Sequence, residues 1–167
     1  MEAIKYIRTQ IAAQLNQKKL YLATAESCTG GLLGHWITDM PGSSAFYVGG
    51  VIAYANQAKV DWLQVSKDCL DRHGAVSRAV VELMASGIRN AFSTQYSPAS
   101  ILGVSITGIA GPSGGTKEKP VGTVWIAVES VFGKQAEKFL FTGEREEIKH
   151  QAAQAALTMV LAHLIAI

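Results

Sequence analysis

The chain has 167 residues, of which 49% are hydrophobic and 17% charged, a balance typical of one compact α/β domain and not of a disordered segment. Its formal net charge of +2 comes from dispersed basic residues, with Lys18 and Lys19 the one adjacent pair, which argues against a nucleic-acid-binding protein. Neither a signal peptide nor a membrane span is expected, because the N-terminus is charged and no apolar run reaches about 18 residues.

Apolar spacing and turn residues predict the elements of the first half of the chain. A first amphipathic helix is expected from apolar residues at three- and four-residue spacing, namely Ile4, Ile7, Ile11 and Leu15. Residues 20–27 are short and apolar enough for a buried strand, and the next helix ends before Pro41 and Gly42. Residues 46–55 are predicted as a second strand, and the helical region after it stops at Gly74.

The next elements are a helix and a third strand. Ser77 is a suitable N-cap for the helix, whose apolar stripe consists of Val80, Val81, Met84, Ile88 and Phe92. Residues 100–108 are predicted as the strand, which leads into the glycine-rich segment 108–115.

The chain is expected to end in a hairpin and a long helix. Residues 123–130 and 138–143 resemble two strands joined by a turn at Gly133. The last helix begins near Glu144, with one side formed by Ile148, Ala152, Ala155, Met159 and His163. Strands separated by helices favour a three-layer α/β/α sandwich with a mixed sheet, in a single domain over residues 1–167.

The cysteine count and the low charge carry two further expectations. Cys28 and Cys69 form neither a disulfide framework nor a metal motif, so we expect a protein of the reducing cytoplasm without a metal or cofactor. A charged fraction of 17% is low for the surface of a lone monomer. We therefore expect a homo-oligomer, with a dimer as the first choice.

The first candidate site is the turn after the first strand, over residues 25–31. Ligands of open α/β sheets bind at the carboxyl ends of strands. Ser27 has this position, and Gly30 and Gly31 open the next helix, whose amides and dipole can stabilise an oxyanion. The same composition also suits an ordinary helix start, so both interpretations remain open. Cys28 is a rival nucleophile that we interpret as a packing residue.

The second candidate site is the glycine-rich segment over residues 107–115. Backbone donors packed around glycines can hold a phosphate or a ribose. The segment is neither a Walker A loop nor a dinucleotide fingerprint, because the Gly-Lys-Ser/Thr sequence and the required glycine spacing are missing. A flexible surface loop is the alternative.

A nucleophilic serine needs a base, and no histidine lies near Ser27 in the sequence. A lysine with a lowered pKa, acting directly or through a tyrosine hydroxyl, is the usual solution without histidine. Tyr54 and Lys59 are predicted to lie at the end of the second strand, where burial would favour the neutral amine. An ordinary buried tyrosine and a solvated lysine are the alternative.

Five collinear segments together resemble the CinA C-terminal domain family of competence/damage-inducible proteins. They are TAESCTGG (24–31), GSSAFYVGGVIAYANQAK (42–59), HGAVS (73–77), SITGIAGPSGGTKEKPVGTVWIA (105–127) and TGEREEI (142–148). Stand-alone members of this family are nicotinamide-mononucleotide deamidases. The resemblance therefore implies a hydrolase that converts nicotinamide mononucleotide to nicotinate mononucleotide and ammonia, without a metal or cofactor.

The resemblance also implies roles for individual residues. Ser27 matches the family's nucleophile, and Tyr54 and Lys59 complete its triad. The matching substrate-binding positions are Thr29, Gly30, Gly31, Thr107, Gly108 and Gly111. Arg145 is a candidate for the phosphate, with an exposed first-turn arginine as the alternative, and Asn56 is either a substrate contact or a turn residue.

Two differences from the family pattern qualify these expectations. Larger relatives carry an N-terminal domain that resembles molybdopterin-cofactor-binding folds, and this sequence corresponds to the other half. Residue 55 is alanine where the family often has serine, which leaves Tyr54 and Lys59 intact. A non-catalytic nucleotide-binding module linked to competence or DNA damage is the alternative function. Such a module would not need Ser27, Tyr54 and Lys59 together.

Overall fold

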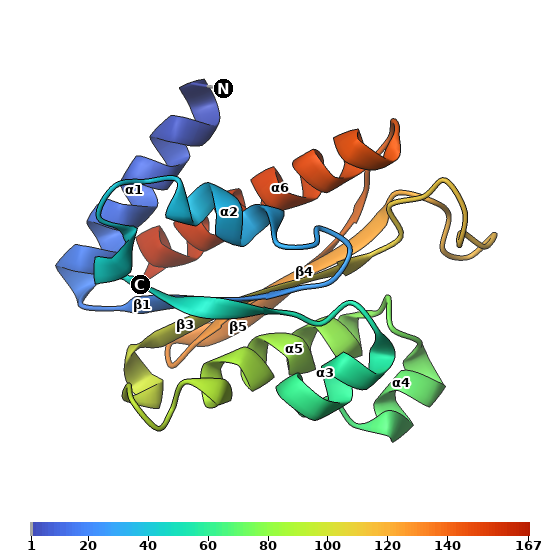
Figure 1. The fold of residues 1–167 in the computed structure, drawn as a ribbon, viewed down its shortest axis with the longest axis horizontal. Helices are drawn as coiled ribbons and strands as arrows, with labels where there is room; N and C mark the ends of the chain where they lie inside the picture. Colours follow the sequence, from blue (N-terminus) through green and yellow to red (C-terminus); the bar gives the residue numbers. More distant parts are fainter. Residues whose placement is uncertain (1) are drawn as a thin grey trace.

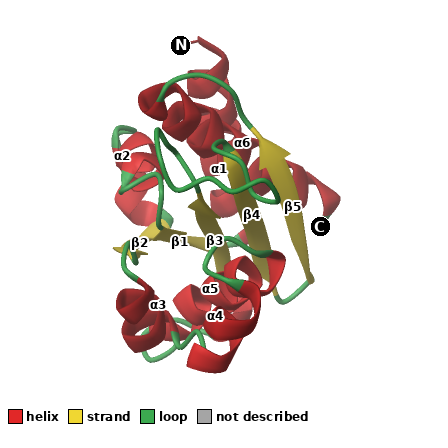
Figure 2. Ribbon diagram, turned by 90° about the vertical axis from the view of Figure 1, so that its right-hand side faces the viewer, coloured by secondary structure: helices red, strands yellow, loops and turns green. Residues whose placement is uncertain are grey.

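A five-stranded sheet lies between two layers of helices in the computed structural model, which describes residues 2–167 (Figures 1 and 2). The strands are β1 (Tyr21–Glu26), β2 (Tyr47–Ile52), β3 (Ile101–Gly108), β4 (Thr123–Ser130) and β5 (Gly133–Leu140). The helices are α1 (Glu2–Lys18), α2 (Leu32–Thr38), α3 (Asn56–Leu63), α4 (Lys67–His73), α5 (Arg78–Ala91) and α6 (Arg145–Ala166), with two 3₁₀ helices, η1 (Ser43–Ala45) and η2 (Pro98–Ser100). Helices α1, α2 and α6 cover one face of the sheet, and α3, α4 and α5 cover the other (Figure 1).

The sheet is mixed, with the strand order β2-β1-β3-β4-β5. Strand β1 pairs in parallel with both neighbours, so that Glu26 lies opposite Ile52 of β2 and Ile106 of β3. Strands β4 and β5 are antiparallel to their neighbours, and Ser130 faces Gly133 at the end of their hairpin. This confirms the predicted three-layer α/β/α fold with a mixed sheet. The carboxyl ends of β1, β2 and β3 consequently meet at one edge.

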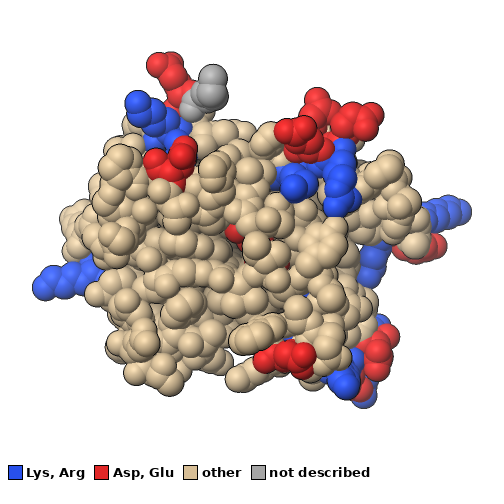
Figure 3. All heavy atoms as spheres, viewed as in Figure 1, with Lys and Arg blue, Asp and Glu red and all other residues tan. Residues whose placement is uncertain are grey.

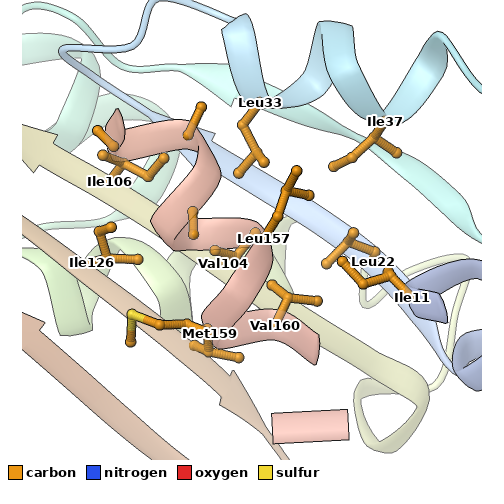
Figure 4. Close-up of a cluster of buried hydrophobic side chains, with 14 of the residues drawn as sticks. Ile11, Leu22, Leu33, Ile37, Val104, Ile106, Ile126, Leu157, Met159 and Val160 are labelled. Atoms are coloured by element: carbon orange, nitrogen blue, oxygen red, sulfur yellow. The ribbon is translucent and has the colours of Figure 1, made fainter. Parts of the chain in front are cut away.

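Helix α6 supplies the centre of the larger core (Figure 4). Its Leu157 and Val160 belong to one buried cluster with Val104 of β3, Ile126 of β4 and Leu33 of α2. Removing such a side chain from water stabilises the fold by roughly 1.5–3 kcal/mol. Helix α6 thereby holds β1, β3 and the start of α2 in a fixed relation.

Helix α5 forms the core of the opposite layer. As predicted, Ser77 caps it, because the Ser77 side chain accepts a hydrogen bond from the Val80 amide. The predicted apolar stripe faces inward, with Met84 and Ile88 fully buried and Phe92 partly buried. Since α5 packs on both the sheet and α3, it sets how closely α3 approaches the carboxyl ends of the strands.

The segment after the second strand differs from the prediction. Strand β2 ends at Ile52 and not at residue 55, and α3 begins at Asn56. Lys59 is therefore one turn inside a helix and not at the end of a strand. The first turn of α3 is polar, so hydrophobic periodicity gave no signal for it.

The last strand also differs from the prediction of residues 138–143. Strand β5 begins at Gly133, directly after a two-residue turn, and ends at Leu140. It is an edge strand whose residues are half-buried or exposed, so its first half carries polar side chains and no apolar alternation. The apolar residues that suggested a later start lie at its end.

Charged side chains are unevenly distributed over the surface. On the face drawn in Figure 3, lysine, arginine and acidic side chains lie mostly at the periphery, and the centre is formed largely by uncharged residues. Among residues 2–167, every helix falls short of the length or apolarity that crossing a bilayer requires.

Candidate active site

A cavity of about 280 Å³ opens where β1, β2 and β3 end. Its walls come from the segments after these strands, from the loop between α4 and α5, and from the first residue of α6. Among the predicted site residues, the lining includes Ser27, Tyr54, Asn56, Lys59, Thr107, Gly108, Gly111 and Arg145. Thr29, Gly30 and Gly31 are not part of the lining. The cavity thus lies at the carboxyl edge of the sheet, where open α/β folds bind ligands.

Ser27 is the first residue after β1 and is almost fully buried. Its amide donates to the Ile106 carbonyl of β3 at 3.0 Å, and its carbonyl accepts from the Gly30 amide at 3.1 Å. Both bonds hold the Ser27 backbone at the floor of the cavity. The side-chain oxygen lies 3.1 Å from Nζ of Lys59.

Lys59 reaches Ser27 from helix α3, although 32 residues separate them in the sequence. Helical side chains lean toward the N-terminus of their helix, so Nζ lies against the residues that precede α3. It donates to the carbonyls of Ala53, at 2.8 Å, and Tyr54, at 3.2 Å. Lys59 is only 1% exposed, and burial lowers its pKa below the ordinary lysine value.

The neutral amine fits these contacts. Within residues 2–167, Lys59 forms no ion pair, and a buried ammonium without an anion is destabilised. Nζ has three oxygen partners, namely the Ala53 and Tyr54 carbonyls and Oγ of Ser27. When the amine is neutral, its two N–H groups serve the carbonyls, and its lone pair can accept the hydroxyl proton of Ser27. The geometry suits a lysine base that acts directly on the serine.

The amides at the start of α2 do not face the cavity as expected. The Gly31 amide donates to the Glu26 carboxylate at 3.1 Å, as does the Thr29 hydroxyl at 2.7 Å. The Gly30 amide is used by the Ser27 carbonyl. In the described part of the chain, the Cys28 amide makes no hydrogen bond to another residue, and Cys28 lines the cavity. Of the residues that follow Ser27 in this turn, Cys28 is the one that lines the cavity, so its amide is the candidate donor to an oxyanion.

Tyr54 and Arg145 form a contact across the cavity mouth. Arg145, at the first position of α6, donates from one terminal nitrogen to the Tyr54 hydroxyl at 2.7 Å and from the other to the Gly111 carbonyl. The Tyr54 ring is largely exposed, and within residues 2–167 its hydroxyl has no hydrogen bond to Ser27 or Lys59. The structure therefore brings Tyr54 to the cavity without the expected relay contact.

The glycine-rich segment after β3 also lines the cavity. The Thr107 hydroxyl donates to the Ala75 carbonyl at 2.9 Å, so it holds the loop between α4 and α5 against β3. A side chain at Gly108 would come within 2.7 Å of Val124, so the glycine permits close packing on β4. Gly111 has φ of 80°, in the left-handed region, and its carbonyl accepts from Arg145.

Cys28 has the features of a packing residue. Its side chain is part of the main hydrophobic core, and burial raises the pKa of its thiol to about 12. A thiol in that state is a poor nucleophile.

The described residues contain no group of three or more His, Cys, Asp or Glu side chains that could hold a metal ion.

Two features of the site were missed by reasoning from the sequence. Glu26 accepts hydrogen bonds from the turn that carries Ser27, and its signal was a lone carboxylate at the end of an apolar strand. Ala75 and Val76 line the cavity within the quoted HGAVS segment, but they bring no reactive group that would attract notice.

The chain is similar to known proteins in sequence and in structure. The profile of the CinA C-terminal domain matches residues 4–164. A CinA-like protein of Syntrophotalea carbinolica is 47% identical over 92% of this chain and 36% of its own length. One from Gemmatimonas aurantiaca is 51% identical over 84% of this chain and 31% of its length. The chain thus spans about a third of the length of the curated relatives it matches.

Solved structures extend the agreement to the whole fold. A competence-damaged protein (CinA) superfamily protein from Klebsiella pneumoniae has a TM-score of 0.90 and 33% identity, and covers 98% of this chain and 99% of that one. The competence/damage inducible protein CihA from Agrobacterium tumefaciens has a TM-score of 0.87 and 36% identity, over 95% and 94% of the two chains. With the matching profile, these similarities show that the chain belongs to the CinA C-terminal domain family.

Proposed function

We propose that this protein is a nicotinamide-nucleotide amidase, which hydrolyses nicotinamide mononucleotide to nicotinate mononucleotide and ammonia. The observation that carries the proposal is the 3.1 Å contact between Nζ of Lys59 and Oγ of Ser27. Burial of a lysine without an ion pair costs free energy, and contact with a serine at the end of a strand is the arrangement that a serine nucleophile with a lysine base requires. The alternative of a non-catalytic nucleotide-binding module gives no reason for the pair.

In the proposed acylation step, Lys59 removes the hydroxyl proton while Oγ of Ser27 attacks the carboxamide carbon of the nicotinamide ring. The amide of Cys28 donates to the oxyanion that forms. The carbon–nitrogen bond then breaks as the ammonium of Lys59 gives its proton to the amide nitrogen, which leaves as ammonia. Assistance from such a base is typically worth about 10²–10⁴-fold in rate.

In the proposed deacylation step, a water molecule attacks the ester carbon and gives a proton to Lys59. The bond between carbon and Oγ of Ser27 breaks, and Oγ recovers its proton from Lys59. Nicotinate mononucleotide then leaves, and the enzyme returns to its starting state. Both half-reactions use the same base, and neither uses a metal or cofactor.

Arg145 supports a phosphorylated substrate. A guanidinium carries five N–H donors, and two of its nitrogens contact Tyr54 and Gly111 here, so further donors remain for a phosphate. Asn56 and Gly111 line the same cavity and offer an amide side chain and a backbone carbonyl to the sugar. The cavity of about 280 Å³ is near the lower end of small-ligand pockets, roughly 300–1,000 Å³.

The test is ammonia release from nicotinamide mononucleotide by the purified protein, followed with a coupled assay. Wild type and the control Ser93→Ala, which changes an exposed serine after α5, are expected to turn over equally. Ser27→Ala is expected to lose at least 10²-fold of the rate while it keeps the fold, judged by circular dichroism. Saturable binding without ammonia release by wild type would instead support a binding module.

A further inference from the structure

Glu26 is a buried carboxylate next to the serine, and the proposed mechanism does not use it. It is 2% exposed at the last position of β1. Its Oε2 accepts hydrogen bonds from the Thr29 hydroxyl at 2.7 Å and from the Gly31 and Leu33 amides, both at 3.1 Å. Its Oε1 accepts from the Gly34 amide at 2.8 Å. Within residues 2–167, it forms no ion pair.

These contacts make Glu26 the cap of α2 from outside the helix. The first amides of a helix have no partner inside it, and the N-cap residue here is Gly31, which has no side chain to offer. The amides of Leu33 and Gly34 are satisfied by Glu26 instead. A carboxylate at a helix N-terminus is also favoured by the helix dipole. The start of α2 is thereby fixed to the end of β1.

The chain between these two points is the short turn that carries Ser27. Gly30 and Gly31 have φ of 64° and 98°, so the turn passes through left-handed conformations that a glycine adopts easily. Backbone hydrogen bonds fix the first part of the turn, from the Ser27 amide to Ile106 and from the Gly30 amide to the Ser27 carbonyl. The Glu26 carboxylate adds contacts to the second part, at Thr29 and at Gly31.

The side chains of Glu26 and Ser27 are neighbours in the sequence but point to opposite faces of the sheet, so the cap of α2 and the proposed nucleophile share one turn. Glu26 points to the layer that contains α2, while Ser27 contacts Lys59 of α3 in the other layer. Successive side chains alternate in this way along a strand and at its end. The turn that Glu26 contacts on one side therefore lines the cavity with Ser27 and Cys28, and the Ser27 hydroxyl contacts Lys59 there.

We propose that Glu26 is a positioning residue: its carboxylate holds the turn from Ser27 to Gly31 in the shape that keeps the Ser27 hydroxyl against Lys59 and the Cys28 amide open to the cavity. This role rests on the proposed function, since it assumes that Ser27 is a nucleophile. A purely structural cap would affect only the stability of the fold. A positioning residue affects the rate of the reaction at Ser27, with little effect on substrate binding.

The test uses the reaction of Ser27 with a fluorophosphonate probe, followed by intact-protein mass spectrometry. In this reaction the bond between Oγ and phosphorus forms, fluoride leaves, and Lys59 takes the hydroxyl proton. Glu26→Gln keeps the size of the side chain but replaces one acceptor oxygen with an NH₂ group. We expect its labelling rate to fall about 10- to 100-fold, as for a small misplacement of a reacting group. With nicotinamide mononucleotide, kcat should fall likewise and KM should change less than about twofold.

Two companion variants separate positioning from stability. Ser66→Ala removes the cap of α4, where the serine accepts from the Cys69 amide, and should lower stability without changing the labelling rate. Thr29→Val removes one of the four bonds to Glu26 at nearly equal volume, so it should fold even where Glu26→Gln does not. We expect Thr29→Val to label several-fold more slowly than wild type.

The outcomes distinguish this inference from the proposed function. If wild type is labelled at Ser27 but releases no ammonia, the substrate is wrong, and the labelling rates still test Glu26. If folded Glu26→Gln and Thr29→Val are labelled as fast as wild type, the positioning role is overturned while the amidase proposal stands. A rise in KM with unchanged kcat would also overturn it. Absence of labelling in wild type would contradict both the nucleophile and the positioning role.

Discussion

At the scale of single residues, the proposed chemistry depends on the position of Lys59. Its amine contacts two carbonyls and the serine, and among residues 2–167 it has no acidic partner. Burial disfavours the ammonium, which lowers the pKa of Lys59 and leaves the neutral base present at a lower pH than for a solvated lysine. The same property that suits catalysis should therefore be visible in the stability of the protein.

The first prediction concerns the pH dependence of that stability. Between the lowered pKa of folded Lys59 and its ordinary value of 10.5, the unfolded chain binds a proton that the folded chain does not. The free energy of unfolding of wild type should therefore rise with pH through this window. Lys59→Met lacks the group, so urea unfolding at several pH values should show wild type gaining stability relative to the variant. Parallel pH curves would contradict the lowered pKa.

The second prediction separates a direct lysine base from a tyrosine relay. The Tyr54 hydroxyl contacts Arg145 and not the reacting pair, so Tyr54→Phe should raise KM and lower kcat less than tenfold. Lys59→Met removes the base and should lower kcat by about 10²–10⁴-fold. Steady-state kinetics of both variants decide the question. Equal losses of kcat would favour the relay.

The sequence predicted Ser27, Lys59 and most of the residues that line the cavity with them, but not the contacts of Glu26. A serine at the end of a strand is visible as a pattern, and the resemblance named its partner lysine. Glu26 could not be assigned, because its partners are backbone amides whose directions depend on where α2 begins. The Gly30 and Gly31 amides were expected to face an oxyanion, but they donate to the Ser27 carbonyl and to Glu26. Their directions also depend on where α2 begins.

At the scale of elements, the contact between α5 and α3 sets the height of Lys59 above the sheet. Gly87 of α5 faces the end of α3, and a Cβ atom there would lie 2.0 Å from the Leu63 carbonyl oxygen. No side chain fits at that distance without a shift of one helix. Because α3 carries Lys59, such a shift would change its distance from Ser27.

The third prediction tests this contact with Gly87→Ala. Overpacking should destabilise the protein by about 1–3 kcal/mol and lower kcat together with stability. Ala91→Gly is the matched control, because it weakens the exposed end of the same helix by about 1 kcal/mol without touching α3. Thermal unfolding and ammonia release are measured for both. Unchanged kcat in a folded Gly87→Ala protein would contradict the link.

The order and type of the elements could be predicted from the sequence, whereas two boundaries could not. Apolar stripes marked α1, α5 and α6, and apolar runs marked β1 and β3. The start of α3 and the first half of β5 are polar, since one lines a cavity and the other is an edge. Hydrophobic periodicity cannot predict the boundary of an element whose residues at that boundary are mostly exposed.

At the scale of the whole molecule, the low fraction of charged residues predicts that the chain associates with copies of itself. Only 17% of residues are charged, and the face in Figure 3 is largely uncharged at its centre. We expect a homodimer, so light scattering coupled to size exclusion should give about twice the chain mass of 17.8 kDa. A mass equal to one chain at micromolar concentration would contradict this expectation.

The central claim is that Ser27 forms a covalent ester during turnover of nicotinamide mononucleotide. The most direct measurement is rapid acid quenching of the reaction, followed by proteolysis and mass spectrometry of the peptide that contains Ser27 and Cys28. We predict a nicotinate mononucleotide adduct on Ser27, absent in Ser27→Ala, which should also release no ammonia. An adduct on Cys28, or ammonia release by Ser27→Ala at the wild-type rate, would contradict the claim.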